Sequence, residues 1–237
     1  RFGFRKILFI SAILAFIALF PLIGVKEIVS SKIHKENFPK LNFKLIKNLP
    51  SNFKRFLLVV CLFSVANFSY MFFLLKSKII LQIKSSYLLS IGIPILMYLL
   101  FNFVTASFSF PAGLWADKSG KEKILSLGYF IYALTVVVFS FAKSLVFLVL
   151  GFILYGISIA LIDGNQRALA SDYSIAEDRG TVLGIFHSGI SFSFLIGGII
   201  TGVLWKINPM IPFIIAGIIS LFCAVRIIQL KTKVART

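Results

Sequence analysis

The chain has 237 residues, of which 59% are hydrophobic and 14% are charged, and its formal net charge is +17. A water-soluble core of this length cannot bury so much apolar surface, so the composition excludes an ordinary soluble domain and predicts a membrane protein. The basic residues lie between hydrophobic runs and mostly on one side of them, so we expect no nucleic-acid partner.

Seven uncharged runs of at least 19 residues follow one another along the chain. Each can cross a bilayer as a helix, because about 20 apolar residues span the hydrocarbon core. A β-barrel would instead show alternating segments of about ten residues. The pattern therefore predicts an all-α polytopic membrane protein. The seven predicted spans are Ile7–Val25, Phe56–Leu75, Ser85–Ala116, Ile124–Ala142, Ser144–Ile162, Gly180–Trp205 and Ile207–Val225.

The loops between these spans differ in charge. When successive loops are placed on alternating sides, 17 of the 25 Lys and Arg residues fall on one side. By the positive-inside rule this side, which includes the C-terminus, is cytoplasmic. Arg1, Arg5 and Lys6 are exceptions to the rule. We expect a multi-pass protein of the cell (plasma or inner) membrane.

The spans are spaced unevenly, which indicates two membrane units. Residues 1–25 are predicted to be the last helix of a preceding N-terminal bundle, and residues 26–55 a long, Lys-rich cytoplasmic linker. Short turns join the spans of residues 56–228, so these six form one antiparallel bundle, and 229–237 form a cytoplasmic tail. Because the chain begins with Arg1 and has an odd number of spans, we interpret it as a fragment of a longer protein.

The segment between the third and fourth spans carries a distinctive sequence. It reads PAGLWADKSGKEK, from Pro111 to Lys123, and is interpreted as a basic turn. Gly113 permits close approach of a helix, and Gly120 permits a positive φ. Asp117 can accept hydrogen bonds from the N-terminus of a neighbouring helix. Such a contact can form in one conformation and break in another.

This turn resembles one in the C-terminal half of major facilitator superfamily transporters, which has the order Gly-x-Leu-Ala-Asp-Arg/Lys-x-Gly-Arg/Lys-Arg/Lys. The chain departs from that pattern at Trp115 and Glu122. A second resemblance lies in 164–184, where Arg-Ala-Leu-Ala-Ser-Asp and Arg-Gly-Thr-Val-Leu-Gly are similar to the inner loop between family helices 10 and 11. The residues that match in the turn are Gly113, Ala116, Asp117, Lys118, Gly120 and Lys121.

The resemblance implies that the seven spans are family helices 6 to 12 and that the last six form a major-facilitator-type bundle. It also implies that Asp117 contacts a helix of the missing N-terminal half, and that Gly180 presents its helix N-terminus to that half. The alternative is a turn that only orients the helices by its charge. The residues assigned to this conformational group are Gly113, Asp117, Lys118, Gly120, Lys121, Arg167, Asp172, Arg179 and Gly180.

Three spans carry polar residues at helical spacing, which predicts a solute-facing stripe on each. By the resemblance these spans are family helices 7, 8 and 11, which line the central cavity. The alternative for each residue is an interhelical hydrogen bond without a ligand. His187 is the only ionisable residue well inside a predicted span. The candidate substrate-binding residues are Asn67, Tyr70, Asn102, Thr105, His187 and Ser191.

The sixth of these spans is also rich in small residues. Gly180 and Gly184, and then Gly198 and Gly202, lie four residues apart, with Gly189 and Gly197 between the pairs. This spacing favours a smooth helix face for close packing, either mobile or static.

The acidic residues and cysteines point away from enzymes. The acids lie in predicted loops, and Asp163 is assigned to a helix end. The sequence indicates no metal site and no cofactor, and no span contains the lysine that a retinal protein needs. Cys61 and Cys223 are interpreted as small core residues.

We predict secondary active transport of a small molecule by alternating access, with efflux of drug-like or amphipathic solutes preferred. The alternatives are a nutrient importer of the same fold and a seven-helix receptor. The predicted partners are a small-molecule solute, the lipid bilayer and the missing N-terminal half. The stripes contain no Arg or Lys, so a neutral or cationic solute is favoured.

Overall fold

The computed structural model describes residues 49–82, 87–174 and 179–230, together with positions 6, 9, 12, 13 and 16; the side chains of 87–91 are outside this description. The chain divides into two compact units, Arg1–Asn48 and Leu49–Thr237. In the first unit the five described residues are helical. Most of the predicted first span and of the predicted linker, and residues 231–237, lie outside the described residues.

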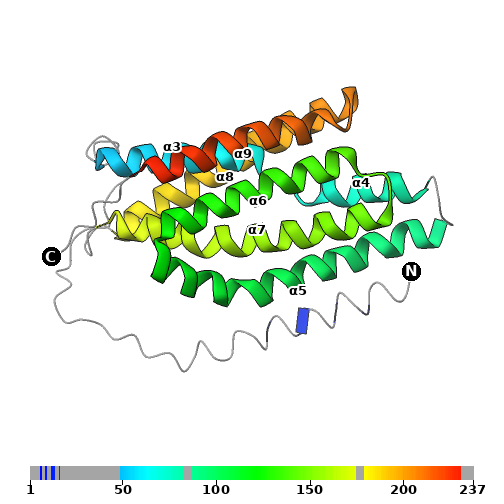
Figure 1. Cartoon of the computed structure of the whole chain (residues 1–237), viewed down its shortest axis with the longest axis horizontal. Helices are drawn as coiled ribbons and strands as arrows, with labels where there is room; N and C mark the ends of the chain where they lie inside the picture. The colour runs from blue at the N-terminus through cyan, green and yellow to red at the C-terminus, as the bar shows by residue number, and fades with distance from the viewer. Residues whose placement is uncertain are drawn as a thin grey trace. The chain divides into compact units, whose positions relative to one another are not determined.

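The second unit is built from helices joined by short turns (Figure 1). Six segments of the described chain are long and apolar enough to cross a membrane, and α3 and α4 together form the first of them. The all-α fold predicted for this part of the chain is therefore confirmed. The helices are α3 (Ser51–Ala66), α4 (Met71–Gln82), α5 (Tyr87–Ser119), α6 (Lys121–Phe141), α7 (Leu145–Asp172), α8 (Arg179–Ile207) and α9 (Ile211–Gln229).

Helix α6 lies at the centre of the bundle and packs against α7 and α9. Helix α5 covers the other side of α7, while α3 packs against α8 and α9 (Figure 1). Stacked rings of Phe63 and Tyr129, 3.9 Å apart at their centroids, join α3 to α6. The Tyr132 hydroxyl donates a hydrogen bond of 3.0 Å to the Ala66 carbonyl at the end of α3. These contacts make the six spans one bundle.

The first span of the bundle is interrupted, which corrects the continuous helix predicted over Phe56–Leu75. Helix α3 ends at Ala66 and α4 begins at Met71. The Ser69 hydroxyl accepts a hydrogen bond of 3.3 Å from the Met71 N–H and so caps the start of α4. The Phe68 ring packs against Phe73 and Phe213, which holds the connecting residues in the core.

The predicted turn over 111–123 is far shorter in the structure. Helix α5 continues through Asp117 and Lys118 to Ser119, and α6 starts at Lys121. Gly120 alone separates the two helices, and its φ is +97°. This confirms the expectation of a positive φ at Gly120. The charged residues of the segment therefore extend from helix ends rather than from a loop.

Replacing Gly120 by alanine is expected to destabilise the protein by about 1–3 kcal/mol, because non-glycine residues are strained in this region of φ and ψ. Only the Glu122 carboxylate approaches the Cβ position, at 3.7 Å, so backbone strain and not a clash sets the cost. The measurement is the thermal unfolding midpoint in detergent. Gly164→Ala is the control: it lies inside α7 with open space around its Cβ, and it should gain about 0.5–1 kcal/mol. Equal midpoints for the two variants would contradict the prediction.

The glycines of α8 fall on two different faces of the helix. A Cβ at Gly197 would collide with the backbone of Val65 in α3, and a Cβ at Gly189 would lie 3.0 Å from the Cys61 sulfur. At Gly180, Gly184, Gly198 and Gly202 a Cβ would meet nothing within 4 Å. The single smooth face expected from the sequence is thus two faces, one of which packs against α3.

Candidate functional site

A pocket of about 360 Å³ lies at the junction of α5, α6 and α7. Four of the residues assigned to the conformational group line it: Asp117, Gly120, Lys121 and Asp172. The Lys121 Nζ lies 2.6 Å from the Asp172 Oδ2, and the two side chains are 27% and 31% exposed. This ion pair joins the start of α6 to the last residue of α7. The sequence matches in the two motifs are therefore adjacent in space.

Asp117 differs from Asp172 in its surroundings. Its carboxylate is exposed and makes no hydrogen bond or ion pair with any residue in the described ranges. Its position in the pocket leaves it available to a hydrogen-bond donor from outside this bundle.

The other members of the conformational group do not line this pocket. Lys118 and Arg179 are exposed, and Gly113 and Gly180 have open space where a Cβ would stand. Arg167 donates a hydrogen bond of 3.1 Å from its Nε to the Asp163 carbonyl, one turn earlier in α7. The structure thus gathers four of the nine residues and leaves the other five outside the pocket lining.

The break between α3 and α4 carries two of the candidate substrate-binding residues. The side-chain carbonyl oxygen of Asn67 is buried and has no hydrogen-bond partner among the described residues. The Tyr70 ring stacks on the Tyr98 ring of α5, with centroids 4.8 Å apart. A buried acceptor without a donor is rare in folded proteins and marks a position where a ligand or water can donate.

The candidate residues of α5 are engaged differently from each other. Asn102 is exposed, and its side-chain amide donates a hydrogen bond of 2.8 Å to the Tyr98 carbonyl of its own helix. The Thr105 hydroxyl lies 2.8 Å from the Phe101 carbonyl and 3.3 Å from the Gly156 carbonyl of α7. Thr105 therefore makes the interhelical contact that was the alternative to solute binding, whereas the carbonyl oxygen of Asn102 stays accessible.

The candidate residues of α8, His187 and Ser191, both lie on an exposed face. The His187 ring contacts the neighbouring Phe186 ring edge-on, with centroids 5.2 Å apart. Helices α5 and α8 are the least covered spans: 17% of their most apolar stretch is buried, against 39–61% in the other four. The polar stripes of these two helices thus lie on the parts of the bundle that the described chain leaves most open.

The sequence interpretation missed a polar group near the end of α7. Asp163 lies inside this helix and within a candidate membrane span, not at a helix end. Two residues later on another face, Asn165 donates to the Leu161 carbonyl. The buried Gln166 side-chain amide donates a hydrogen bond of 2.8 Å to the Tyr129 hydroxyl of α6. The i, i+4 spacing of Asp163 and Arg167, with no proline between them, is the signal that could have placed both on one helix.

In the part of the chain that the structure describes, no group of residues is arranged for metal binding or for thiol chemistry. The His, Cys, Asp and Glu residues of this part form no group of three that could hold a metal ion. Cys61 and Cys223 are free thiols. The Cys223 sulfur lies 3.6 Å from the Val59 carbonyl, where it packs α9 against α3.

Comparison with known proteins decides the family. A family model described as Major Facilitator Superfamily matches residues 79–236. An uncharacterized MFS-type transporter of Methanocaldococcus jannaschii is 37% identical over 222 residues, which cover 93% of this chain and 54% of that protein. The chain belongs to the major facilitator superfamily. It spans about half the length of this relative.

Two further relatives of this major facilitator chain carry names that refer to drug resistance. Multidrug resistance protein 1 of Bacillus subtilis is 29% identical over 114 residues, covering 48% of this chain and 29% of that protein. Quinolone resistance protein NorA of Staphylococcus aureus is 24% identical over 118 residues, covering 50% of this chain and 30% of that protein. The bundle of α3 to α9 is thus a bundle of the major facilitator type in an integral membrane protein.

Proposed function

We propose that the chain is the C-terminal half of a secondary active transporter, which moves a small molecule across the cell membrane by alternating access. Membership of the major facilitator superfamily supports this function. The described bundle accounts for six spans, and the relative from Methanocaldococcus jannaschii is about twice as long as the aligned region. The partner that completes the transporter is an N-terminal bundle. The loops on the side of the C-terminus hold most of the Lys and Arg residues, and this supports a cytoplasmic C-terminus by the positive-inside rule.

The observation that carries the proposal is the break in the first span of the bundle. Transporters bind solutes near the membrane midplane, where interrupted helices free polar groups. Here the break leaves the buried Asn67 carbonyl oxygen unpaired, and it places Tyr70 against Tyr98 of α5. In this proposal the solute donates a hydrogen bond to Asn67 and packs against these two rings. Asn102, His187 and Ser191 complete the proposed set on α5 and α8, together with the Thr105 oxygen, which can only accept from the solute because its proton is donated to carbonyls.

The chemistry of these residues favours an uncharged or cationic amphipathic solute. None of the proposed residues carries a permanent positive charge to attract an anion. The aromatic pair Tyr70 and Tyr98 offers a flat apolar surface with faces that attract cations. Export of such compounds is the proposed direction, and the drug-resistance names of two relatives support it. The residues of the conformational group, including Asp117 and Arg179, are proposed to control the change of access.

The proposal is tested by measuring flux of ethidium, a fluorescent amphipathic cation, in cells that express the full-length protein. Cells with the wild-type protein should lose preloaded ethidium faster than cells without it. Asn67→Ala should raise the apparent KM for ethidium about tenfold, because a hydrogen bond to the solute is worth about 1.4 kcal/mol. Ser107→Ala is the matched control, since that exposed hydroxyl bonds only the Phe103 carbonyl of its own helix.

Three results would count against this function. Equal ethidium loss with and without the protein would contradict export of an amphipathic cation. Faster uptake into energised cells would reverse the direction in favour of the importer. If Asn67→Ala and Ser107→Ala had the same KM, the helix break would not be part of the solute site.

A further inference from the structure

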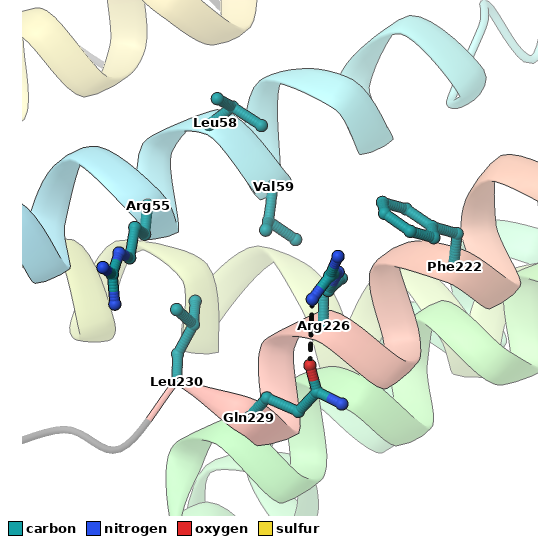
Figure 2. Close-up of a pocket in the computed structure, with 7 residues that line it drawn as sticks. All are labelled: Arg55, Leu58, Val59, Phe222, Arg226, Gln229 and Leu230. Carbon is teal, nitrogen blue, oxygen red and sulfur yellow. Dashed lines mark hydrogen bonds between the residues drawn. The ribbon is translucent and has the colours of Figure 1, made fainter.

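A groove of about 420 Å³ opens between α3 and α9, and it shares no lining residue with the Asp117 pocket. It is lined by both arginines of these two helices, Arg55 and Arg226 (Figure 2). Leu58, Val59 and Phe222 form its apolar wall, and Gln229 and Leu230 close its end. The groove therefore combines two cations with a hydrophobic surface.

Arg226 is held in place by two neighbours. Its Nη1 lies 3.3 Å from the Gln229 Oε1, one turn later in α9. Its guanidinium carbon lies 5.2 Å from the centre of the Phe222 ring, within the range of a cation–π contact. Figure 2 shows the guanidinium group beside Val59 of α3. These contacts orient the cation and leave its charge without an ion-pair partner among the described residues.

Arg55 supplies the second cation from the opposite wall. It is exposed and forms no ion pair with any residue of the described ranges. Three acids of the described chain, Asp117, Glu122 and Asp172, line a different pocket. The groove is thus complementary in charge to an anion.

The position of the groove identifies the kind of anion. Arg55 lies in the second turn of α3, and Arg226 lies in the last turn of α9, so both stand where their membrane spans end. Leu58 and Phe222 lie next to them on the side of the hydrocarbon, and they are 66% and 49% exposed. A ligand here meets two guanidinium groups at the headgroup level and an apolar surface below them.

We propose that this groove binds an anionic phospholipid. The lipid phosphate lies between Arg55 and Arg226, whose planar forks can each donate two hydrogen bonds to phosphate oxygens. One acyl chain runs along Leu58 and Phe222. Basic pockets between membrane helices bind lipid headgroups through the same chemistry. The site is separate from the proposed solute site, so it does not depend on the transport proposal.

The test is lipid binding to the purified full-length protein, measured by native mass spectrometry during titration with phosphatidylglycerol or with phosphatidylcholine of the same acyl chains. The wild-type protein should prefer phosphatidylglycerol. The double variant Arg55→Gln/Arg226→Gln should bind it about thirtyfold more weakly, since each basic residue contributes roughly a factor of five near anionic lipid. Both side chains are exposed, so the variant should keep the wild-type circular dichroism spectrum.

Lys78→Gln/Lys206→Gln removes the same charge from the opposite end of the bundle and should bind phosphatidylglycerol like the wild type. An equal loss in this control would show that net charge alone attracts the lipid and would overturn the site. An unchanged preference in the arginine variant would also overturn it. Excess inorganic phosphate should leave the lipid bound, and its displacement would identify a free-phosphate site instead.

Discussion

Asp117→Asn is expected to lower solute flux by a factor of about 10 to 100 while membrane insertion and protein amount stay at the wild-type level. The carboxylate is exposed at the end of α5 and has no ion-pair partner among the described residues. In the proposed transporter it accepts hydrogen bonds from the N-terminal bundle in one of the two access states. A charge-assisted hydrogen bond contributes about 1.5–3 kcal/mol, and its loss shifts the ratio of the two states by the stated factor.

Glu122→Gln is the matched control for Asp117→Asn. It removes the same charge from the same pocket, at a position in the first turn of α6. The flux of Glu122→Gln should remain within about twofold of the wild type. This result would show that the position of the Asp117 carboxylate is important, rather than the net charge of the pocket. Ethidium flux and a cell-surface labelling assay measure the two quantities. Wild-type flux in Asp117→Asn would rule out a conformational role for this residue.

Gly197→Ala is expected to reduce the free energy of unfolding by about 3 kcal/mol, the upper part of the usual range for overpacking. The added Cβ would overlap the Val65 carbonyl group and lie 3.0 Å from the Val65 Cα. All three nearest atoms belong to the backbone of α3, so no side-chain rotation can relieve the contact. Helices α3 and α8 would have to separate, which weakens the packing along their whole length.

Gly198→Ala gives the comparison for this change. The two glycines are adjacent in α8, and a Cβ at Gly198 meets nothing within 4 Å. Gly198→Ala should unfold at or slightly above the wild-type temperature, because alanine is about 1 kcal/mol more favourable than glycine inside a helix. Thermal unfolding of both variants in the same detergent measures the difference. A smaller loss for Gly197→Ala than for Gly198→Ala would disprove the close contact with Val65.

The sequence predicted the number and order of the six described spans because long uncharged runs are a strong signal. It predicted the helix ends poorly. Charged residues such as Asp117, Lys118 and Arg167 were assigned to loops, but backbone hydrogen bonds continue through them in α5 and α7. A change from apolar to charged residues marks the membrane surface, and a helix can extend beyond that surface.

The sequence predicted only part of the candidate site, because it shows which residues are neighbours along the chain but not which helices pack together. Asp117, Gly120 and Lys121 are neighbours in sequence, so their proximity followed from the motif. Their approach to Asp172, 51 residues after Lys121, depends on how α6 packs against α7. The break at Asn67 has no glycine or proline to announce it, and the unpaired amide oxygen appears only when the surrounding helices are in place. The role of His187 and Ser191 stays a prediction, since their face of α8 is uncovered.

The interruption at Asn67 to Tyr70 also divides the first span into two short rods. The rod α3 is fixed by α8 and α9, whereas α4 packs mainly beside α5. The Phe72 N–H donates a hydrogen bond of 3.1 Å to the Ser69 carbonyl, and the Phe68 ring packs on Phe73 and Phe213, so the connecting residues are anchored to the start of α4. Since α5 also packs against α7, the second rod is joined to the rest of the bundle through α5, and the two halves of this span have different supports.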